Sequence, residues 1–344
     1  MRNSRELVLQ SLRHEPPDRT PVIPLAGLFT TTVSGIPVNK LLRDADAQTR
    51  SQLASLRQFG YDGVVTIMDL TAEAEALGAT VKYQETAFPY ITKHPYPVAA
   101  DFPDLELPEI RKTRLSVFVE TTRSLVKQVG KTHFVGSYVI GPFTLAGQLM
   151  GVDPLFELIT DDPDRALSIV NSCENVLEPY VERLLEAGTH SVIILEPTAS
   201  SSVVPPDFFV RYSVPNVKKL ISLARAQGAG STLHICGNTT KIIGLMCDTG
   251  ADALSLDSKI SIEAAMKTVN QRCTIIGNVD TTLMLTGTVD EIVTATEQCI
   301  QAAGPSGAGF IASTGCDLPV ETPFDNVRAL VDTAKGHKPA KRSL

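Results

Sequence analysis

Long hydrophobic runs and blocks of one charge are both missing from this sequence. No stretch approaches the roughly 18 consecutive apolar residues that a membrane-spanning helix requires. The 31 basic and 38 acidic residues are spread along the chain and give a net charge of −7. The chain therefore lacks the basic block that a nucleic acid or an anionic membrane surface would attract. We expect neither a membrane nor a nucleic acid to be the main partner.

Cysteine is too sparse for a fold held together by disulfides. Six cysteines in 344 residues do not resemble the dense frameworks of small secreted domains. Residues 1–21 also lack the apolar core of a secretory signal, so we expect a cytoplasmic protein whose thiols are mostly buried and reduced. The six are Cys173, Cys236, Cys247, Cys273, Cys299 and Cys316.

Eight short apolar segments, mostly separated by helical patterns, organise the chain. That number favours a (β/α)8 TIM barrel over a doubly wound open sheet. No G-x-G-x-x-G follows the first segment to indicate a dinucleotide site. The predicted strands are 21–28, 64–69, 133–140, 191–196, 231–236, 252–257, 273–280 and 309–314.

The predicted barrel forms a single α/β domain over residues 1–344. A helix at 4–14 precedes it as an N-terminal extension, and the barrel itself covers about 21–335. Residues 80–110 are rich in Pro, Thr and Tyr and have no helical periodicity. We expect them to form an irregular insertion after the second strand, with a short hairpin and a lid.

The segment LHICGNTT at 233–240 carries the strongest chemical signal. His234 and Cys236 stand two positions apart on a predicted strand, so their side chains share one face. Imidazole and thiolate are zinc ligands. Cys316 follows the last predicted strand by two residues, and active sites of barrels lie at the carboxyl ends of the strands. Cys316 is therefore the expected third ligand, ahead of Cys247, which falls on a helix outside the barrel. The alternative is that His234 and Cys236 are buried core residues.

Three carboxylates also stand where predicted strands end. Glu196 is a candidate fourth zinc ligand, displaced by substrate, or a carboxylate that orients a ligand. Its alternative role is in a structural hydrogen-bond network. Asp69 and Asp257 are candidates for orienting substrate or positioning protons, and each is equally well explained as a loop cap. The serines at 200–202 are expected to form a flexible rim.

The predicted ligand set favours one kind of chemistry. Three protein ligands leave an open coordination position, as a catalytic zinc site requires. One imidazole and two thiolates make an electron-rich site that generates hydroxide poorly. Such a metal suits a thiol substrate, because the bound thiol loses its proton and becomes a nucleophile at neutral pH.

Five segments resemble the uroporphyrinogen decarboxylase superfamily, and more narrowly its methylcorrinoid:coenzyme M methyltransferase branch. They are SRELVLQSLRHEPPDRTPV at 4–22, TAEAEALGA at 71–79, GSYVIGPFTLAGQL at 136–149, HICGNTT at 234–240 and STGCDLPVETPFDNVRALV at 313–331. The resemblance implies a TIM barrel and a zinc-dependent enzyme that moves a methyl group from a methylated corrinoid to a thiol such as coenzyme M. It makes His234, Cys236 and Cys316 the zinc ligands.

The resemblance also implies a partner protein that carries the corrinoid. A corrinoid carrier has a D-x-H-x-x-G motif for the cobalt ligand, and none of the six histidines stands in one. This absence argues against the chain being a carrier itself.

A metal-independent decarboxylase of a tetrapyrrole or a related acid is the alternative within the superfamily. That branch uses arginines in the first strand loop to hold substrate carboxylates. Here residues 24–35 read PLAGLFTTTVSG, without arginine. Asp69 does fall where the branch has an essential aspartate, so this alternative remains open.

Overall fold

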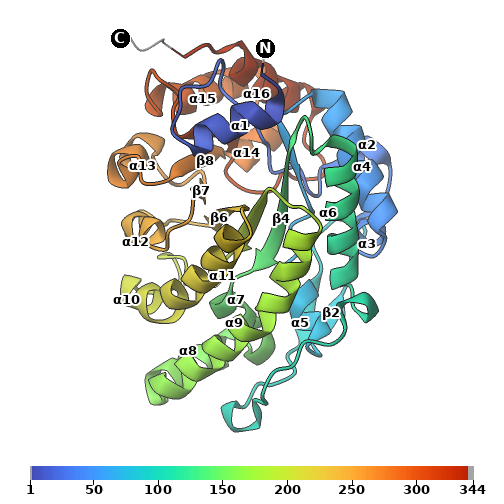
Figure 1. The fold of residues 1–344 in the computed structure, drawn as a ribbon, viewed down its shortest axis with the longest axis vertical. Helices are drawn as coiled ribbons and strands as arrows, with labels where there is room; N and C mark the ends of the chain where they lie inside the picture. Colours follow the sequence, from blue (N-terminus) through green and yellow to red (C-terminus); the bar gives the residue numbers. More distant parts are fainter. Residues whose placement is uncertain (1, 340–344) are drawn as a thin grey trace.

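A computed structural model describes residues 2–339 of the chain. Its main feature is a curled, fully parallel sheet of seven strands in the order β1-β4-β5-β6-β7-β8-β9, with helices arranged around it (Figure 1). The strands are β1 Gly63–Val65, β4 Phe134–Ile140, β5 Ser191–Leu195, β6 Gly230–Ile235, β7 Ala253–Leu256, β8 Thr274–Val279 and β9 Phe310–Thr314. This arrangement confirms the predicted TIM-like α/β barrel.

The first predicted strand, 21–28, forms only an isolated bridge, between Val22 and Ala312. The peptide groups of residues 21–23 nonetheless connect both edges of the sheet. Ala312 N–H donates to the Pro21 carbonyl at 2.9 Å, and Asp62 N–H donates to the Val22 carbonyl at 2.8 Å. Pro21 and Pro24 have no N–H to donate, so a regular ladder cannot extend along this segment. An irregular eighth segment therefore closes the barrel.

Side chains that alternate along the strands fill the barrel in layers. At the amino-terminal end, Ile23, Phe134 and Ile311 form a cluster with Val8 of α1 (Ser4–Leu12). The next layer toward the carboxyl end contains Leu25, Val65, Met68, Tyr138, Ile193 and Leu195. Apolar side chains therefore fill much of the barrel interior, beginning at its amino-terminal end.

Sixteen α-helices are found among the described residues. Those not yet given are α2 Thr30–Ser34, α3 Val38–Leu41, α4 Ala45–Phe59, α5 Ala72–Ala76, α6 Leu115–Val129, α7 Pro142–Met150, α8 Val152–Asp161, α9 Pro163–Glu186, α10 Pro206–Phe208, α11 Val214–Ala226, α12 Ile243–Asp248, α13 Ile262–Val269, α14 Thr281–Thr286, α15 Val289–Ala302 and α16 Phe324–Gly336. Four short turns accompany them, η1 Ala99–Asp101, η2 Ile110–Lys112, η3 Pro197–Ala199 and the π-helical η4 Phe209–Ser213. None of the helices in residues 2–339 has the length and apolar character needed to cross a bilayer.

The predicted insertion at 80–110 contains the expected hairpin. Strands β2 (Thr80–Lys82) and β3 (Tyr90–Lys93) pair antiparallel, and η1 and η2 follow them. In Figure 1 this segment extends beyond the ring of helices at the bottom of the view, whereas α1 lies at the top. The insertion therefore lies at the end of the barrel opposite α1.

Candidate metal centre

His234, Cys236 and Cys316 meet at the carboxyl end of the barrel. One nitrogen or sulfur atom from each lies within 4.8 Å of the other two. His234 Nε2 is 3.1 Å from Cys236 Sγ, and the two sulfurs are 3.7 Å apart. The structure thus brings together the three side chains that the sequence predicted, although 80 residues separate the cysteines. One nitrogen and two sulfurs are a donor set that fits zinc with an open position.

Ser255 fixes the orientation of the His234 ring. Nδ1 lies 3.2 Å from the Ser255 carbonyl and 3.0 Å from its hydroxyl. In the tautomer that donates Nδ1–H to this carbonyl, the Nε2 lone pair faces Cys236 and is free to bind a metal. Ser255 lies opposite His234 in the β6–β7 ladder, and the sequence analysis missed it. Ser255 stands two residues before Asp257 on the same strand face, and this spacing could have indicated that it belongs to the site.

The loop after Cys236 is anchored from two sides. Gly237 N–H donates to Asp257 Oδ2 at 2.8 Å, and Asn238 N–H donates to Ser202 Oγ at 2.9 Å. Gly237 has φ of +84°, and an added Cβ would lie 3.0 Å from Ser200 Oγ, so this position favours glycine. Ser202 therefore helps to hold this loop, and the flexibility expected of residues 200–202 stays a prediction.

Cys316 is held by its two chain neighbours. A Cβ on Gly315 would lie 2.5 Å from the Ser258 nitrogen, so only glycine allows this approach. Asp317 is buried, and its carboxylate accepts hydrogen bonds from Gly27 N–H at 3.0 Å and Leu28 N–H at 2.9 Å. The residue after Cys316 is thereby tied to the segment that closes the barrel.

The two site cysteines share a hydrogen bond that gives their thiols different pKa values. The hydrogen bond between the two sulfurs lowers the pKa of Cys316, and the neighbouring His234 lowers it further. The same pairing, together with burial, raises the pKa of Cys236. One thiolate therefore forms readily at this site, as metal ligation requires.

Glu196 does not join the three ligand atoms. Its backbone N–H donates to the His234 carbonyl at 3.0 Å, but its side chain turns to the start of α7. There it accepts hydrogen bonds from the N–H groups of Phe143 and Thr144 and from the Ser213 hydroxyl, each at 3.0 Å. Burial raises the pKa of Glu196, and these donors oppose the shift. These contacts favour the structural network that was the alternative for Glu196.

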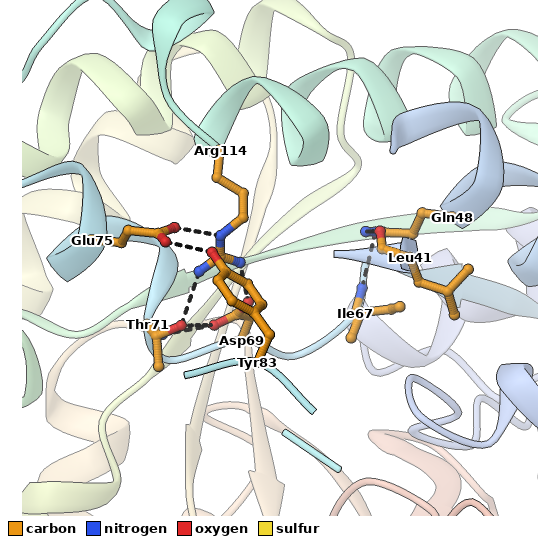
Figure 2. Close-up of polar contacts among 8 residues, drawn as sticks. All are labelled: Leu41, Gln48, Ile67, Asp69, Thr71, Glu75, Tyr83 and Arg114. Atoms are coloured by element: carbon orange, nitrogen blue, oxygen red, sulfur yellow. Dashed lines mark hydrogen bonds and ion pairs between the residues drawn. The ribbon is translucent and has the colours of Figure 1, made fainter. Parts of the chain in front are cut away.

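Asp69 also has its carboxylate occupied. Figure 2 shows Arg114 reaching from the start of α6 toward Asp69, Thr71 and Glu75. Asp69 pairs with the guanidinium and accepts from the N–H and hydroxyl of Thr71, both at 2.7 Å. Arg114 in turn donates to Glu75 at 2.6 Å. Asp69 thus belongs to an ion-pair cluster, whereas Asp257 contacts the loop of Cys236.

An apolar pocket lies beside the barrel mouth, at the base of the insertion. Its volume is about 340 Å³, and its lining includes Met68, Leu70, Phe88, Ile91 and Gln148. Met68 belongs to the layer that fills the barrel interior, and Leu70 and Phe88 pack against that layer. The pocket therefore adjoins the interior of the barrel.

Residues 3–337 match the family model described as Uroporphyrinogen decarboxylase (URO-D). The chain belongs to the uroporphyrinogen decarboxylase family. This confirms the resemblance that the five sequence segments indicated.

Two kinds of enzyme occur among the relatives in this family. The methylcobamide:CoM methyltransferase MtbA of Methanosarcina acetivorans is 28% identical over 343 residues, covering 97% of this chain and 98% of that protein. A uroporphyrinogen decarboxylase of Nocardioides sp. is 25% identical over 336 residues, covering 94% of each. A solved structure of a methyltransferase from Methanosarcina mazei matches with a TM-score of 0.89 at 25% identity, covering 98% of this chain and 99% of that one. The residues of the site must therefore indicate which of these two activities this chain has.

Proposed function

We propose that this protein is a zinc-dependent methyltransferase that moves a methyl group from a methylated corrinoid to a thiol such as coenzyme M. The observation that carries this proposal is the convergence of His234, Cys236 and Cys316 within 4.8 Å at the barrel mouth. A metal-independent decarboxylase has no use for two cysteines and a histidine arranged in this way. The relatives named as methylcobamide:CoM methyltransferases support the same activity.

The chain would hold the metal through His234 Nε2 and the two cysteine sulfurs. When bound, zinc lowers the pKa of a coordinated thiol, so the acceptor is a thiolate at neutral pH. Ser255 keeps the imidazole in one tautomer, and Asp257 holds the loop that carries Cys236. These contacts would hold the three ligand side chains in place around a bound metal.

The transfer balances without an added oxidant or reductant. The acceptor sulfur uses a lone pair to form the new S–C bond, and the Co–C bond breaks with both electrons remaining on cobalt. Co(III) thereby becomes Co(I), and the thiol proton would be released to solvent when the sulfur binds. The methylcorrinoid is a co-substrate, and we propose that a separate corrinoid-carrying protein delivers it in the cytoplasm.

The contacts of Asp69 count against the decarboxylase alternative. A substrate-binding aspartate needs acceptor positions left open for the substrate. Here one oxygen accepts two hydrogen bonds from Thr71 and the other is paired with Arg114, so most of the acceptor positions of the carboxylate are used within the protein. Arg114 has only 6% of its side chain exposed, and its three partners are all within the protein. This cluster supports a structural role for Asp69.

The test is methyl transfer under anaerobic conditions from methylcobalamin to coenzyme M, followed by the absorbance change from methyl-Co(III) to Co(I). We expect transfer with zinc-loaded protein, loss of transfer after chelation, and recovery when zinc is restored. If zinc-loaded protein transfers no methyl group to any of a panel of thiols but decarboxylates uroporphyrinogen, the proposal is wrong and the alternative is correct.

A further inference from the structure

Tyr138 places a polar atom inside the barrel where no described residue accepts or donates a hydrogen bond. It lies in β4 and packs among Leu25, Val65, Ile193 and Leu195 in the upper interior layer. Only 4% of the residue is exposed, and its hydroxyl has no hydrogen-bond partner among residues 2–339. A phenylalanine would fill the same space without burying an unsatisfied hydroxyl.

The neighbours of Tyr138 are connected to the metal-centre ligands. Leu25 N–H donates to Thr314 Oγ1 at 3.1 Å, and Leu318 N–H donates to the Leu25 carbonyl at 2.7 Å. Thr314 and Leu318 stand two residues before and two residues after Cys316 in the chain. Leu195 stands opposite His234 in the β5–β6 ladder. Tyr138 therefore packs against residues that flank two of the three ligands.

The electrostatic surroundings keep the Tyr138 hydroxyl protonated. Burial raises its pKa well above the usual value of 10, and the negative charges of Asp317 and Cys316 raise it further. Cys316 is a candidate ligand of the metal centre, and Asp317 is the next residue in the chain. At neutral pH the hydroxyl is a hydrogen-bond donor close to this centre.

We propose that the Tyr138 hydroxyl donates a hydrogen bond to the sulfur of the acceptor thiol at the metal centre. This inference rests on the proposed function, because it requires a thiol to bind there. A sulfur that carries negative charge is a strong acceptor for a buried O–H. Tyr138 then contacts substrate directly and favours the ionised form of the acceptor over the neutral thiol.

The test compares Tyr138→Phe with Tyr61→Phe in zinc-loaded protein. Tyr61 is 1% exposed, its hydroxyl is also without a partner among the described residues, and it packs in the cluster between sheet and helices. The dissociation constant of coenzyme M is measured by calorimetry between pH 6 and 8, together with zinc content and thermal midpoint. None of these measurements depends on methyl transfer.

We expect Tyr138→Phe to weaken coenzyme M binding about tenfold or more, the scale of one hydrogen bond to a charged group. Zinc content should be unchanged, and the thermal midpoint should be equal or higher, because an unsatisfied hydroxyl has been removed. Tyr61→Phe should bind coenzyme M as the wild type does. Equal binding by Tyr138→Phe would overturn the proposal, as would weak binding accompanied by lost zinc and a lower midpoint.

A second experiment shows whether the Tyr138 hydroxyl donates to the acceptor thiol or to one of the cysteine ligands. In cobalt(II)-substituted protein without any acceptor, the thiolate-to-cobalt absorption bands should be the same in wild type and Tyr138→Phe. A shift of these bands in the absence of acceptor would assign the hydrogen bond to Cys236 or Cys316 and overturn the inference. If wild-type zinc protein binds no thiol at all, the proposed function itself fails and this inference fails with it.

Discussion

Cys236 and Cys316 differ from the other four cysteines in their surroundings. Both lie beside an imidazole at the mouth of the barrel, and they share a single hydrogen bond between their sulfurs. Cys247 instead lies on α12, with 7% of its surface exposed. Cys236 and Cys316 follow the ends of β6 and β9, whereas Cys247 lies on a helix outside the barrel.

Replacing Cys316 by alanine should remove most of the zinc and the methyl transfer activity while leaving the fold intact. Two ligands bind zinc far more weakly than three, and the side chain lies at the barrel mouth outside the main hydrophobic cluster. Zinc per chain and the circular dichroism spectrum measure the outcome. Cys247→Ala is the matched control and should keep its zinc. Zinc loss in Cys247→Ala with full loading of Cys316→Ala would contradict the ligand assignment.

Glu73 makes protein stability depend on pH. Burial raises its pKa from 4.5 to about 7, and only one carboxylate oxygen has a partner, the Ile140 N–H at 2.9 Å. The folded protein thus binds more protons than the unfolded chain between these values. The free energy of unfolding is therefore highest below pH 4.5, decreases as the pH rises toward 7, and stays at the lower value above pH 7.

Glu73→Gln should remove this loss. The free energy of unfolding of the variant relative to wild type should increase by about 3 kcal/mol between pH 4.5 and pH 8. Urea denaturation at a series of pH values measures the difference, with Glu182→Gln on the exposed face of α9 as the control. A constant difference across this range would show that the Glu73 carboxyl is not the source.

At the scale of elements, helix α7 begins on a buried carboxylate. Glu196 accepts two N–H groups from the first turn of α7, where the helix dipole favours negative charge. A Cβ on Gly141 would lie 2.0 Å from Glu196 Oε2, so the residue before the helix is restricted to glycine. The carboxylate thus connects the end of β5 to the helix after β4.

Glu196→Gln should lower the free energy of unfolding by about 2 kcal/mol, because its amide group cannot accept from Thr144 N–H as the carboxylate does. Methyl transfer per zinc-loaded molecule should change little. Denaturation curves and turnover normalised to zinc content give the two readouts. A large loss of turnover with unchanged stability would instead make Glu196 a catalytic residue.

Several elements could be predicted from local sequence and others could not. Asp162 before Pro163 marks the start of α9, and the structure confirms the cap, which accepts from Arg165 N–H at 3.0 Å. Residues 207–227 have a helical pattern, but the π-helical turn η4 interrupts the helix just before Pro215. Residues 39–59 also have a helical pattern, but two helices, α3 and α4, cover this segment, with Asp44 capping the second. Such breaks depend on tertiary packing that periodicity does not record.

The same distinction applies to the site. His234 and Cys236 were predictable because alternation along a strand fixes their common face, and Cys316 because it follows the end of a strand. The direction of Glu196 was not, because it depends on how the chain turns after β5, where this residue has φ of −124° and ψ of 50°. The pairing of Asp69 with Arg114 joins residues 45 positions apart, and no local pattern indicates it.

At the scale of the whole molecule, an ion pair secures the closure of the barrel. Asp62 is fully buried and accepts from the Arg19 guanidinium at 2.7 and 2.6 Å and from Val22 N–H at 2.9 Å. It therefore holds the irregular segment 21–23 against the start of β1. This segment also supports the site, because Asp317 binds the peptide groups that follow it.

Asp62→Ala should lower the free energy of unfolding by about 3 kcal/mol, because it leaves a guanidinium and a buried N–H without their acceptor. Guanidinium denaturation measures the change. Asp164→Ala, which removes an exposed pair with Arg211, is the control and should change stability by about 0.5 kcal/mol or less. Similar effects for the two variants would contradict the role given to Asp62.

The central claim is that a thiol binds zinc at a site built from His234, Cys236 and Cys316. X-ray absorption at the zinc edge, on protein purified without a metal-chelating tag, tests it most directly. We predict about one zinc per chain with two sulfur ligands at about 2.3 Å and nitrogen at about 2.0 Å. Addition of coenzyme M should raise the number of sulfur ligands to three. Absence of tightly bound zinc, or a sulfur number that stays at two with coenzyme M present, would contradict the account.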